Sequence, residues 1–337
     1  MFRSAERSDG PAQRTSHVRR PGDRNEPMTG RQAQPADGSE PPVRTAGRLA
    51  LVNGKLVPEE AATVSVFDHG LLFGDGVYDT MFAHRRKIFR LKQHLARLRR
   101  SCDAIGLIPP YTDAELQRAV LMIARSNDLP EAYIKVMVTR GVGKQPLLDP
   151  RNCKPTVIVF VQPYLNQMPR ARVAKGLSAK IANTRRMGAS VLDPRVKSLN
   201  YLPFILARME ATQAGHDDAL LLDDQGNVCE AAGSNLFIVE RGQLRTPDRS
   251  ILEGITRQAV LDLCNELGLI SRQEILTTMD VTRADEVFLT STVGGLMPVT
   301  SIEGYRVGEG VPGPVYLRLR NEFRSRIDAG WDCTAFD

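Results

Sequence analysis

The chain has 337 residues, of which 42% are hydrophobic and 25% charged, a composition typical of globular proteins that bury a sizeable core. No apolar run approaches the roughly 20 residues that span a bilayer, which excludes an integral membrane protein. The net charge of +6 is spread along the chain, and no basic run alternates with aromatic residues, which argues against nucleic-acid binding.

The first segment, residues 1–47, is predicted to be a disordered tail. It contains six prolines, many polar and charged residues and few large apolar ones. Such a segment buries too little apolar surface to offset the entropy lost on ordering. We assign it no function.

The next part of the chain predicts a mixture of strands and helices. Two apolar runs flank Asn53-Gly54, a pair that favours a type I′ hairpin turn. Apolar residues at helical spacing predict one helix over 91–105 that ends at Gly106, and a second is predicted over 113–126. Strands are predicted at 48–57 on both sides of the turn, 77–83, 87–90, 132–139 and 155–162.

The second half again mixes both types of element. Strands are predicted at 177–183, 218–222, 235–240, 243–246, 286–290 and 297–302, and helices at 200–214, 254–268 and 314–327. The pattern predicts an α/β and α+β fold in two domains. The expected boundaries are a small N-terminal domain at 48–165, a linker at 166–175, a larger C-terminal domain at 176–330 and a tail at 331–337.

Cysteine and lysine usage restricts the possible chemistry. The five cysteines lie far apart without the spacing of a metal site, so neither disulfides nor a bound metal is expected, and a reducing, cytoplasmic compartment is indicated. Only nine of the 45 basic residues are lysines, and Lys197 is the last of them. Chemistry that needs an amine able to lose its proton therefore has few candidates.

Four short segments combine reactive or polar residues with small ones. Lys197 precedes an apolar helix, and Glu230 is followed by a run of small residues. The segment 252–257 leads into a helix whose first N–H groups could bind a phosphate together with the Thr256 hydroxyl. A Thr-Ser-Thr turn at 290–292 follows a predicted strand. Each signal alone is weak, because surface lysines, surface glutamates and ordinary helix caps are far more common.

Taken together and in order, these and neighbouring segments resemble one family. Over roughly residues 48–328, the chain resembles the class IV (fold type IV) aminotransferases, which use pyridoxal 5′-phosphate, and most of all the branched-chain amino acid aminotransferases. The matching segments are 67–78, 89–98, 138–141, 197–201, 230–235 and 252–257. The resemblance implies a two-domain enzyme with its active site in the cleft between the domains.

The resemblance also implies roles for particular residues. Lys197 would be the catalytic residue, which binds the cofactor covalently and moves the substrate proton. Glu230 would pair with the pyridine nitrogen, Tyr201 would bind the ring oxygen O3′, and Leu252 would lie against the ring. The cofactor phosphate would be held by Arg97, the backbone amides of Ile255 and Thr256, and the Thr292 hydroxyl.

The implied substrate-binding residues depart in part from the family pattern. They are Tyr78, Thr80, Tyr133, Lys135 and Val293. Branched-chain enzymes typically have Phe-Glu-Gly-Ile-Arg where this chain has Tyr78-Asp-Thr-Met-Phe82. Lys135 replaces an arginine that contacts the substrate carboxylate in that group. Lysine can still pair with a carboxylate, but as a point charge rather than as a bidentate fork.

We therefore expect amino transfer between a branched-chain or aliphatic amino acid and 2-oxoglutarate, as in branched-chain amino acid biosynthesis. Three alternatives on the same scaffold stay open. A D-amino acid aminotransferase would carry an Arg-Ala-His sequence that 142–147 lacks, whereas (R)-amine aminotransferases share the patterns at 246–249 and 294–298. Aminodeoxychorismate lyase also has threonine near position 80. A non-catalytic relative is disfavoured because the expected active-site residues are all present.

The resemblance implies a homodimer, or a higher homo-oligomer, in which each active site borrows a loop from the neighbouring subunit. The candidate cross-subunit segments are 67–73 and 147–151. Two histidines lie near the expected site. His69 falls in a family motif and is interpreted as ordering that loop, and His94, on the helix that carries Arg97, is interpreted as structural.

Overall fold

A computed structural model describes residues 47–145, 147–165 and 168–336, all of which belong to one compact unit. The tail predicted at 1–47 lies outside the described residues except for Gly47. Among the helices of the described residues, none is both long enough and apolar enough to cross a membrane.

The first of two sheets contains seven strands and is antiparallel throughout, in the order β16-β4-β3-β5-β6-β1-β2. Its strands are β1 (Leu49–Val52), β2 (Lys55–Pro58), β3 (Gly76–His84), β4 (Lys87–Phe89), β5 (Ala132–Val142), β6 (Lys154–Pro163) and β16 (Cys333–Ala335). The predicted first hairpin is confirmed. Asn53 and Gly54 have φ values of 50° and 80°, as a type I′ turn requires.

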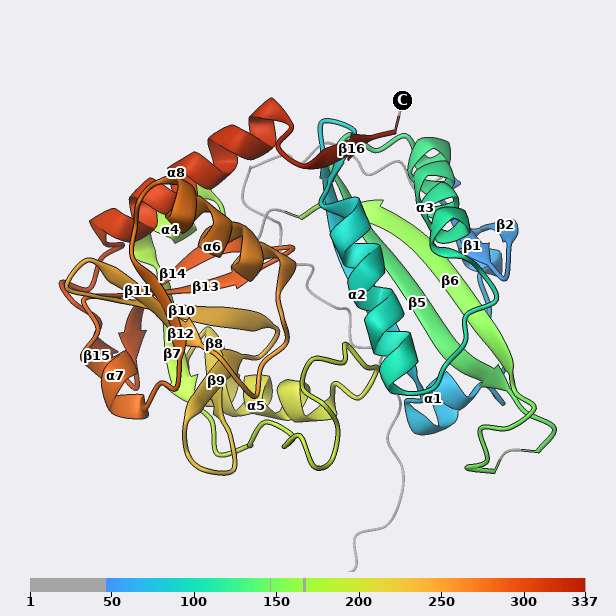
Figure 1. Cartoon of the computed structure of the whole chain (residues 1–337), viewed down its shortest axis with the longest axis horizontal. Coiled ribbons are helices and arrows are strands. Elements are labelled where there is room, and N and C mark those ends of the chain that lie inside the picture. Colours follow the sequence, from blue (N-terminus) through green and yellow to red (C-terminus); the bar gives the residue numbers. More distant parts are fainter. Residues whose placement is uncertain (1–46, 146, 166–167, 337) are drawn as a thin grey trace, which may run out of the picture. The chain divides into compact units, whose positions relative to one another are not determined.

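Helices α2 (Leu91–Ala104) and α3 (Asp113–Asn127) cover one face of this sheet (Figure 1). Leu91, Leu95 and Leu98 of α2 are buried in one cluster with Val77 and Met81 of β3. The apolar residues whose spacing predicted this helix therefore form its buried face. The opposite face of β3 presents its alternate residues toward the functional site described below. The short helices η1 (Glu59–Ala61) and α1 (His69–Phe73) precede β3.

The second sheet contains nine strands and is mixed, in the order β12-β11-β10-β13-β14-β7-β8-β9, with β15 on β14. Parallel pairing occurs between β11 and β12, β14 and β7, and β7 and β8. The strands are β7 (Leu177–Ile181), β8 (Asp218–Leu222), β9 (Val228–Ala231), β10 (Ser234–Glu240), β11 (Gln243–Pro247), β12 (Ser271–Glu274), β13 (Glu286–Ser291), β14 (Gly295–Ile302) and β15 (Tyr305–Arg306).

Helices cover both faces of the second sheet. They are α4 (Arg170–Lys175), α5 (Leu202–Gln213), α6 (Ile255–Glu266), α7 (Thr278–Thr282) and α8 (Pro314–Ala329). Leu220 and Leu222 of β8 belong to the core with α6 and α8, whereas Ala219 and Leu221 belong to the core with α5. Alternate residues of β8 therefore point to opposite faces, and α5 lies on the face away from α6 and α8.

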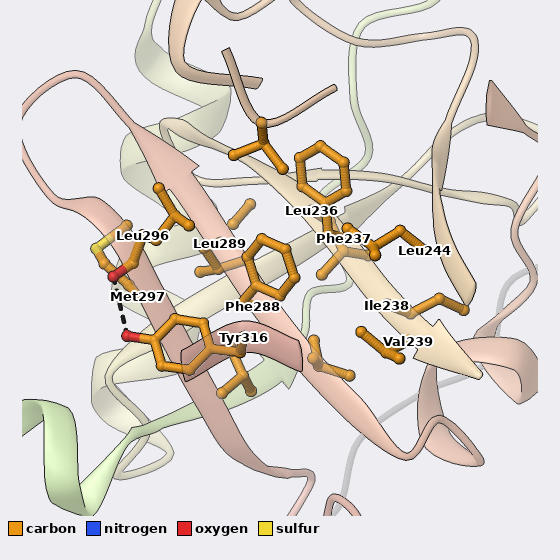
Figure 2. Close-up of a cluster of buried hydrophobic side chains, with 14 of the residues drawn as sticks. Leu236, Phe237, Ile238, Val239, Leu244, Phe288, Leu289, Leu296, Met297 and Tyr316 are labelled. Carbon is orange, nitrogen blue, oxygen red and sulfur yellow. Dashed lines mark hydrogen bonds between the residues drawn. The ribbon is translucent and has the colours of Figure 1, made fainter. Parts of the chain in front are cut away.

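The largest core centres on aromatic rings beneath α8 (Figure 2). Phe237 of β10 and Phe288 of β13 stack with ring centroids 5.1 Å apart, and Tyr316 of α8 lies 5.7 Å from Phe288. The Tyr316 hydroxyl donates to the Leu296 carbonyl at 3.1 Å. Burial of each large ring stabilises the fold by roughly 1.5–3 kcal/mol, so this cluster holds β10, β13 and α8 firmly together.

Two segments differ from the sequence-based expectation. The linker expected at 166–175 contains α4, and the tail expected at 331–337 contains β16. Phe336, just after β16, is completely buried, and its amide donates to the Arg86 carbonyl at 3.1 Å. Neither segment has an apolar pattern of its own that would predict these elements, because their stabilising partners lie elsewhere in the chain. The same reason explains the unpredicted α1, α7, β9, β12 and β15.

Candidate active site

The backbone around Lys197 is held by elements from the first half of the chain. The Tyr78 amide donates to the Lys197 carbonyl at 3.0 Å, and the Leu199 amide donates to the Gly76 carbonyl at 2.9 Å. The Lys197 amide donates to the Ser101 hydroxyl of α2 at 3.1 Å. The backbone of Lys197 is thus anchored to β3 and α2, more than 90 residues earlier in the chain. The local sequence around Lys197 does not predict these contacts.

The side chain of Lys197 points to a cluster of tyrosines. Its amine Nζ donates to the Tyr201 hydroxyl at 3.1 Å and lies 4.6 Å from the centroid of the Tyr78 ring. The rings of Tyr78 and Tyr201 meet edge to face at 5.3 Å. Tyr201 immediately precedes α5, whose first turn therefore fixes the position of its hydroxyl relative to the amine. Lys197 and Tyr201, to which the resemblance gives separate roles toward the cofactor, are therefore in direct contact.

Glu230 on β9 is buried and fully engaged by neighbouring donors. Arg186 donates through Nε to Glu230 at 2.8 Å, and the Leu252 amide and the Asn235 side chain donate to its other oxygen at 3.1 and 3.3 Å. Arg186 also donates to the Pro194 carbonyl at 3.1 Å. Both members of the ion pair are therefore held in one orientation.

Burial raises the pKa of the Glu230 carboxyl, and the guanidinium of Arg186 and the backbone amide of Leu252 oppose that rise. Arg186 therefore favours the ionised form of this carboxyl. A buried carboxylate with a neighbouring arginine can in turn stabilise a proton on a nitrogen base placed against it.

Arg97 and the start of α6 bring several donors together. Arg97 is buried on α2 and donates to the Glu253 carbonyl at 3.1 Å. Gly254 precedes α6 and approaches Asn235 so closely that a Cβ would lie 1.9 Å from its side-chain oxygen, so only glycine fits. The first amides of α6, at Ile255 and Thr256, have no acceptor within the helix and suit an anion.

These residues surround one cavity with an empty volume of about 680 Å³. Its lining includes all eight residues predicted for catalysis and cofactor binding: Arg97, Lys197, Tyr201, Glu230, Leu252, Ile255, Thr256 and Thr292. The cavity is also lined by Thr290, whose buried hydroxyl has no hydrogen-bond partner in the part of the chain that the structure describes. A buried polar atom without a partner is costly, and a polar ligand in the cavity would satisfy it.

The predicted substrate-binding residues lie beside this cavity, and none of the five belongs to its lining within the described residues. Thr80 is opposite Lys135, and Phe82 is opposite Tyr133, in the β3–β5 register. Together with Tyr78, these side chains share the face of the first sheet that α2 and α3 leave uncovered.

Lys135 connects this face to the cavity. Its amine lies 4.2 Å from the centroid of the Tyr78 ring, the ring that Lys197 also contacts. Burial lowers the pKa of Lys135, and the charge of Lys197 lowers it further. Val293 is held through its backbone, whose carbonyl accepts a hydrogen bond from the Tyr164 hydroxyl at 2.5 Å. Lys135 and Val293 are thus held by contacts with Tyr78 and Tyr164, respectively.

The residues that the sequence reading missed are the partners of the predicted ones. Arg186 and Asn235 hold Glu230, and Asp79 pairs with Arg97 through Nε at 2.8 Å. Nothing in the sequence distinguishes Arg186 among 36 arginines. Asp79 could have been noticed, because it stands where the branched-chain pattern Phe-Glu-Gly-Ile-Arg has its glutamate.

A half-buried amine, a buried carboxylate–arginine pair and a helix N-terminus around one cavity define the site of an enzyme that binds an anionic cofactor. Comparison with known families agrees with this class. Residues 76–302 match the family model "Amino-transferase class IV". The chain belongs to this family, and the transaminase activity predicted from the sequence is confirmed.

Individual relatives are similar over most of the chain. A putative branched-chain-amino-acid aminotransferase of Methanocaldococcus jannaschii is 43% identical over 289 residues, which is 85% of this chain and 98% of the relative. A D-alanine aminotransferase of Bacillus licheniformis is 33% identical, over 82% of this chain and 96% of the relative.

A solved structure confirms the predicted fold class. The branched-chain amino acid aminotransferase of Thermobaculum terrenum, in its pyridoxal-phosphate holo form, has 30% sequence identity and a TM-score of 0.79. The match covers 86% of this chain and 99% of that one.

Proposed function

We propose that the chain uses pyridoxal 5′-phosphate to transfer an amino group between a branched-chain or other aliphatic amino acid and 2-oxoglutarate. The observation that carries the proposal is the single cavity, where the Lys197 amine, the Glu230–Arg186 pair and the phosphate-type donors of Arg97 and α6 face the same space. The unpartnered Thr290 hydroxyl supports a polar ligand there.

The residues present fit this cofactor. When bound, pyridoxal 5′-phosphate supplies an electron sink that acidifies the Cα–H of an amino acid. Lys197 would take that proton on Nζ and return it, with Tyr201 orienting the amine. Ionised Glu230 would hold a proton on the ring nitrogen, and Arg186 would keep Glu230 ionised. Arg97, the α6 amides and Thr292 would bind the phosphate.

The face beside the cavity supports an aliphatic substrate. Tyr78, Phe82 and Tyr133 offer apolar ring surface, and the rings of Tyr133 and Phe160 lie 6.3 Å apart. Lys135 offers a cation for the substrate carboxylate. The names of the first relative and of the solved structure, both branched-chain aminotransferases, agree with this choice.

The half-reaction with single amino donors tests the substrate. We expect L-leucine to bleach the yellow holoenzyme and 2-oxoglutarate to restore the colour, because the apolar face accepts an aliphatic side chain and Lys135 its carboxylate. Equal amounts of D-alanine and (R)-1-phenylethylamine serve as controls. Faster bleaching by either control would favour the alternative aminotransferases, and pyruvate release from aminodeoxychorismate would favour a lyase.

We also propose a homodimer formed through an apolar surface on α1, the loop before it and α5. Six side chains on this α1–α5 surface are between 48% and 65% exposed: Val66, Phe67, Leu71, Leu202, Ile205 and Met209. The Asn200 side chain donates to the Gly74 carbonyl at 3.2 Å, so the end of α1 and the start of α5 are neighbours. Apolar patches of this kind mark protein interfaces. The segment 147–151, with Leu148 80% exposed, remains a candidate cross-subunit loop.

We expect Ile205→Asp to weaken self-association at least tenfold, because a charge would be buried in the interface. Sedimentation velocity over a concentration series measures this. Ile108→Asp is the matched control, since Ile108 is 83% exposed and lies outside the α1–α5 surface. A wild-type chain that is monomeric at micromolar concentrations would contradict the proposal.

We also propose the domain division and the cytoplasmic location that the sequence predicts. A division into domains at 166–175 is supported by the two separate sheets, because all strands of the first sheet except β16 precede this segment and all strands of the second follow it. A cytoplasmic location is supported by the five cysteines, each of which is a free thiol.

A further inference from the structure

A buried three-residue cluster lies directly behind the proposed phosphate site. Asp79 on β3 and His94 and Arg97 on α2 are 0%, 1% and 3% exposed. Arg97 binds Asp79 bidentately, from Nε to one carboxylate oxygen at 2.8 Å and from a terminal nitrogen to the other at 2.9 Å. The His94 ring nitrogen Nδ1 lies 2.7 Å from the same Asp79 carboxylate. The three side chains form one hydrogen-bonded unit.

The charge states within the cluster follow from its contacts. Burial would raise the pKa of Asp79, but Arg97 and His94 lower it by more, so the carboxylate is ionised. Burial lowers the pKa of His94, and Asp79 opposes this only in part, so the imidazole is neutral. A neutral ring next to a carboxylate donates its Nδ1–H to it. Asp79 is thus held by His94, by Arg97 and by the Thr80 amide at 2.8 Å.

The hydrogen bonds of Arg97 determine which of its donors remain for a ligand. A guanidinium has five N–H groups. Asp79 takes two of them and the Glu253 carbonyl takes a third. One N–H remains on each of the two terminal nitrogens, and Arg97 lines the cavity. Two donors on one rigid plane can pair with two oxygens of a phosphate.

We propose that Asp79 and His94 are positioning residues that orient Arg97 so that its two remaining donors face the cofactor phosphate. Asp79 fixes the inner edge of the guanidinium, and His94 fixes the carboxylate of Asp79. This inference rests on the proposed function, and it assigns to His94 a role beyond the structural one suggested by the sequence.

The test compares binding of pyridoxal 5′-phosphate with binding of pyridoxal, which lacks the phosphate, by equilibrium dialysis against the apoenzyme. We expect His94→Leu to reduce the preference for the phosphorylated form about tenfold, with pyridoxal affinity unchanged. His94→Asn is the matched control. Its side-chain amide can donate from near the position of Nδ1, so the preference should stay within about twofold of wild type.

A second background shows whether the effect passes through Arg97. The Arg97→Gln variant lacks the guanidinium that would bind the phosphate. In that variant, His94→Leu should cause no further change in the preference for pyridoxal 5′-phosphate over pyridoxal. Equal weakening of both ligands by His94→Leu, or an effect that persists in Arg97→Gln, would overturn the inference. A wild-type chain that binds both ligands equally well would contradict the phosphate site of the proposed function as well. Asp79→Asn should also reduce the preference, and if it does not fold, the His94 variants decide.

Discussion

Replacement of Lys197 by arginine should abolish turnover, with a loss of about 10⁴-fold or more, because a guanidinium keeps its proton and cannot form the covalent bond to the cofactor. The yellow colour of the holoenzyme should disappear in the same variant. Borohydride reduction followed by peptide mass spectrometry is an independent readout. It should attach the cofactor to the peptide with Lys197 in the wild-type chain and to no peptide in Lys197→Arg.

Lys180→Arg is the matched control for this change. Lys180 is a strand lysine whose amine lies 3.5 Å from Glu303, away from the cavity, and arginine can keep that pair. Its turnover should equal that of the wild type. Retained turnover in Lys197→Arg, or cofactor attached by borohydride to a different lysine, would refute the assignment of the catalytic residue.

Glu230→Gln should lower kcat about 100-fold or more, because the neutral amide cannot stabilise a proton on the cofactor nitrogen. The same change leaves Arg186 charged and buried without its partner, which costs about 3–5 kcal/mol of stability. Steady-state kinetics and urea unfolding measure the two effects separately. Unchanged kcat would contradict the role given to Glu230.

Two further variants separate lost chemistry from lost stability. In the double variant Arg186→Met with Glu230→Gln no buried charge is left unpaired, so stability should largely recover while kcat stays low. Glu286→Gln should lose about 1–3 kcal/mol of stability with kcat unchanged. Glu286 is buried, lies outside the cavity lining and accepts from the Val315 and Tyr316 amides at the start of α8. Recovery of kcat along with stability in the double variant would show that Glu230 acts only structurally.

Regular elements with a local signal were predictable from the sequence. The strand at Asp218–Leu222 was predicted with the bounds that the structure has, and the helix predicted over 91–105 is α2 within one residue. Their patterns of apolar residues describe local geometry directly. The short strand Cys333–Ala335 was missed, because it pairs with Lys87–Phe89, which lies in the first third of the chain.

The residues of the candidate site likewise divide into those that the sequence predicted and those that it did not. The predicted cofactor residues line one cavity, and all of them except Thr292 lie in one of the six segments that match the family. The partners of those residues carried little or no such signal. Arg186 meets Glu230 across 44 residues of chain, and Asp79 meets Arg97 between a strand and a helix.

The amino-acid sequence by itself therefore determined the fold class and the family, and it singled out Lys197 as the candidate reactive lysine. Composition, periodicity and ordered motifs are properties of the linear chain and can be recognised without its structure. Only the tertiary structure decided which charges are buried together, as with Glu230 and Arg186 or Asp79 and Arg97. Burial removes water and makes each unpaired charge costly, so a charge must meet its partner in space, and that partner can lie anywhere in the sequence.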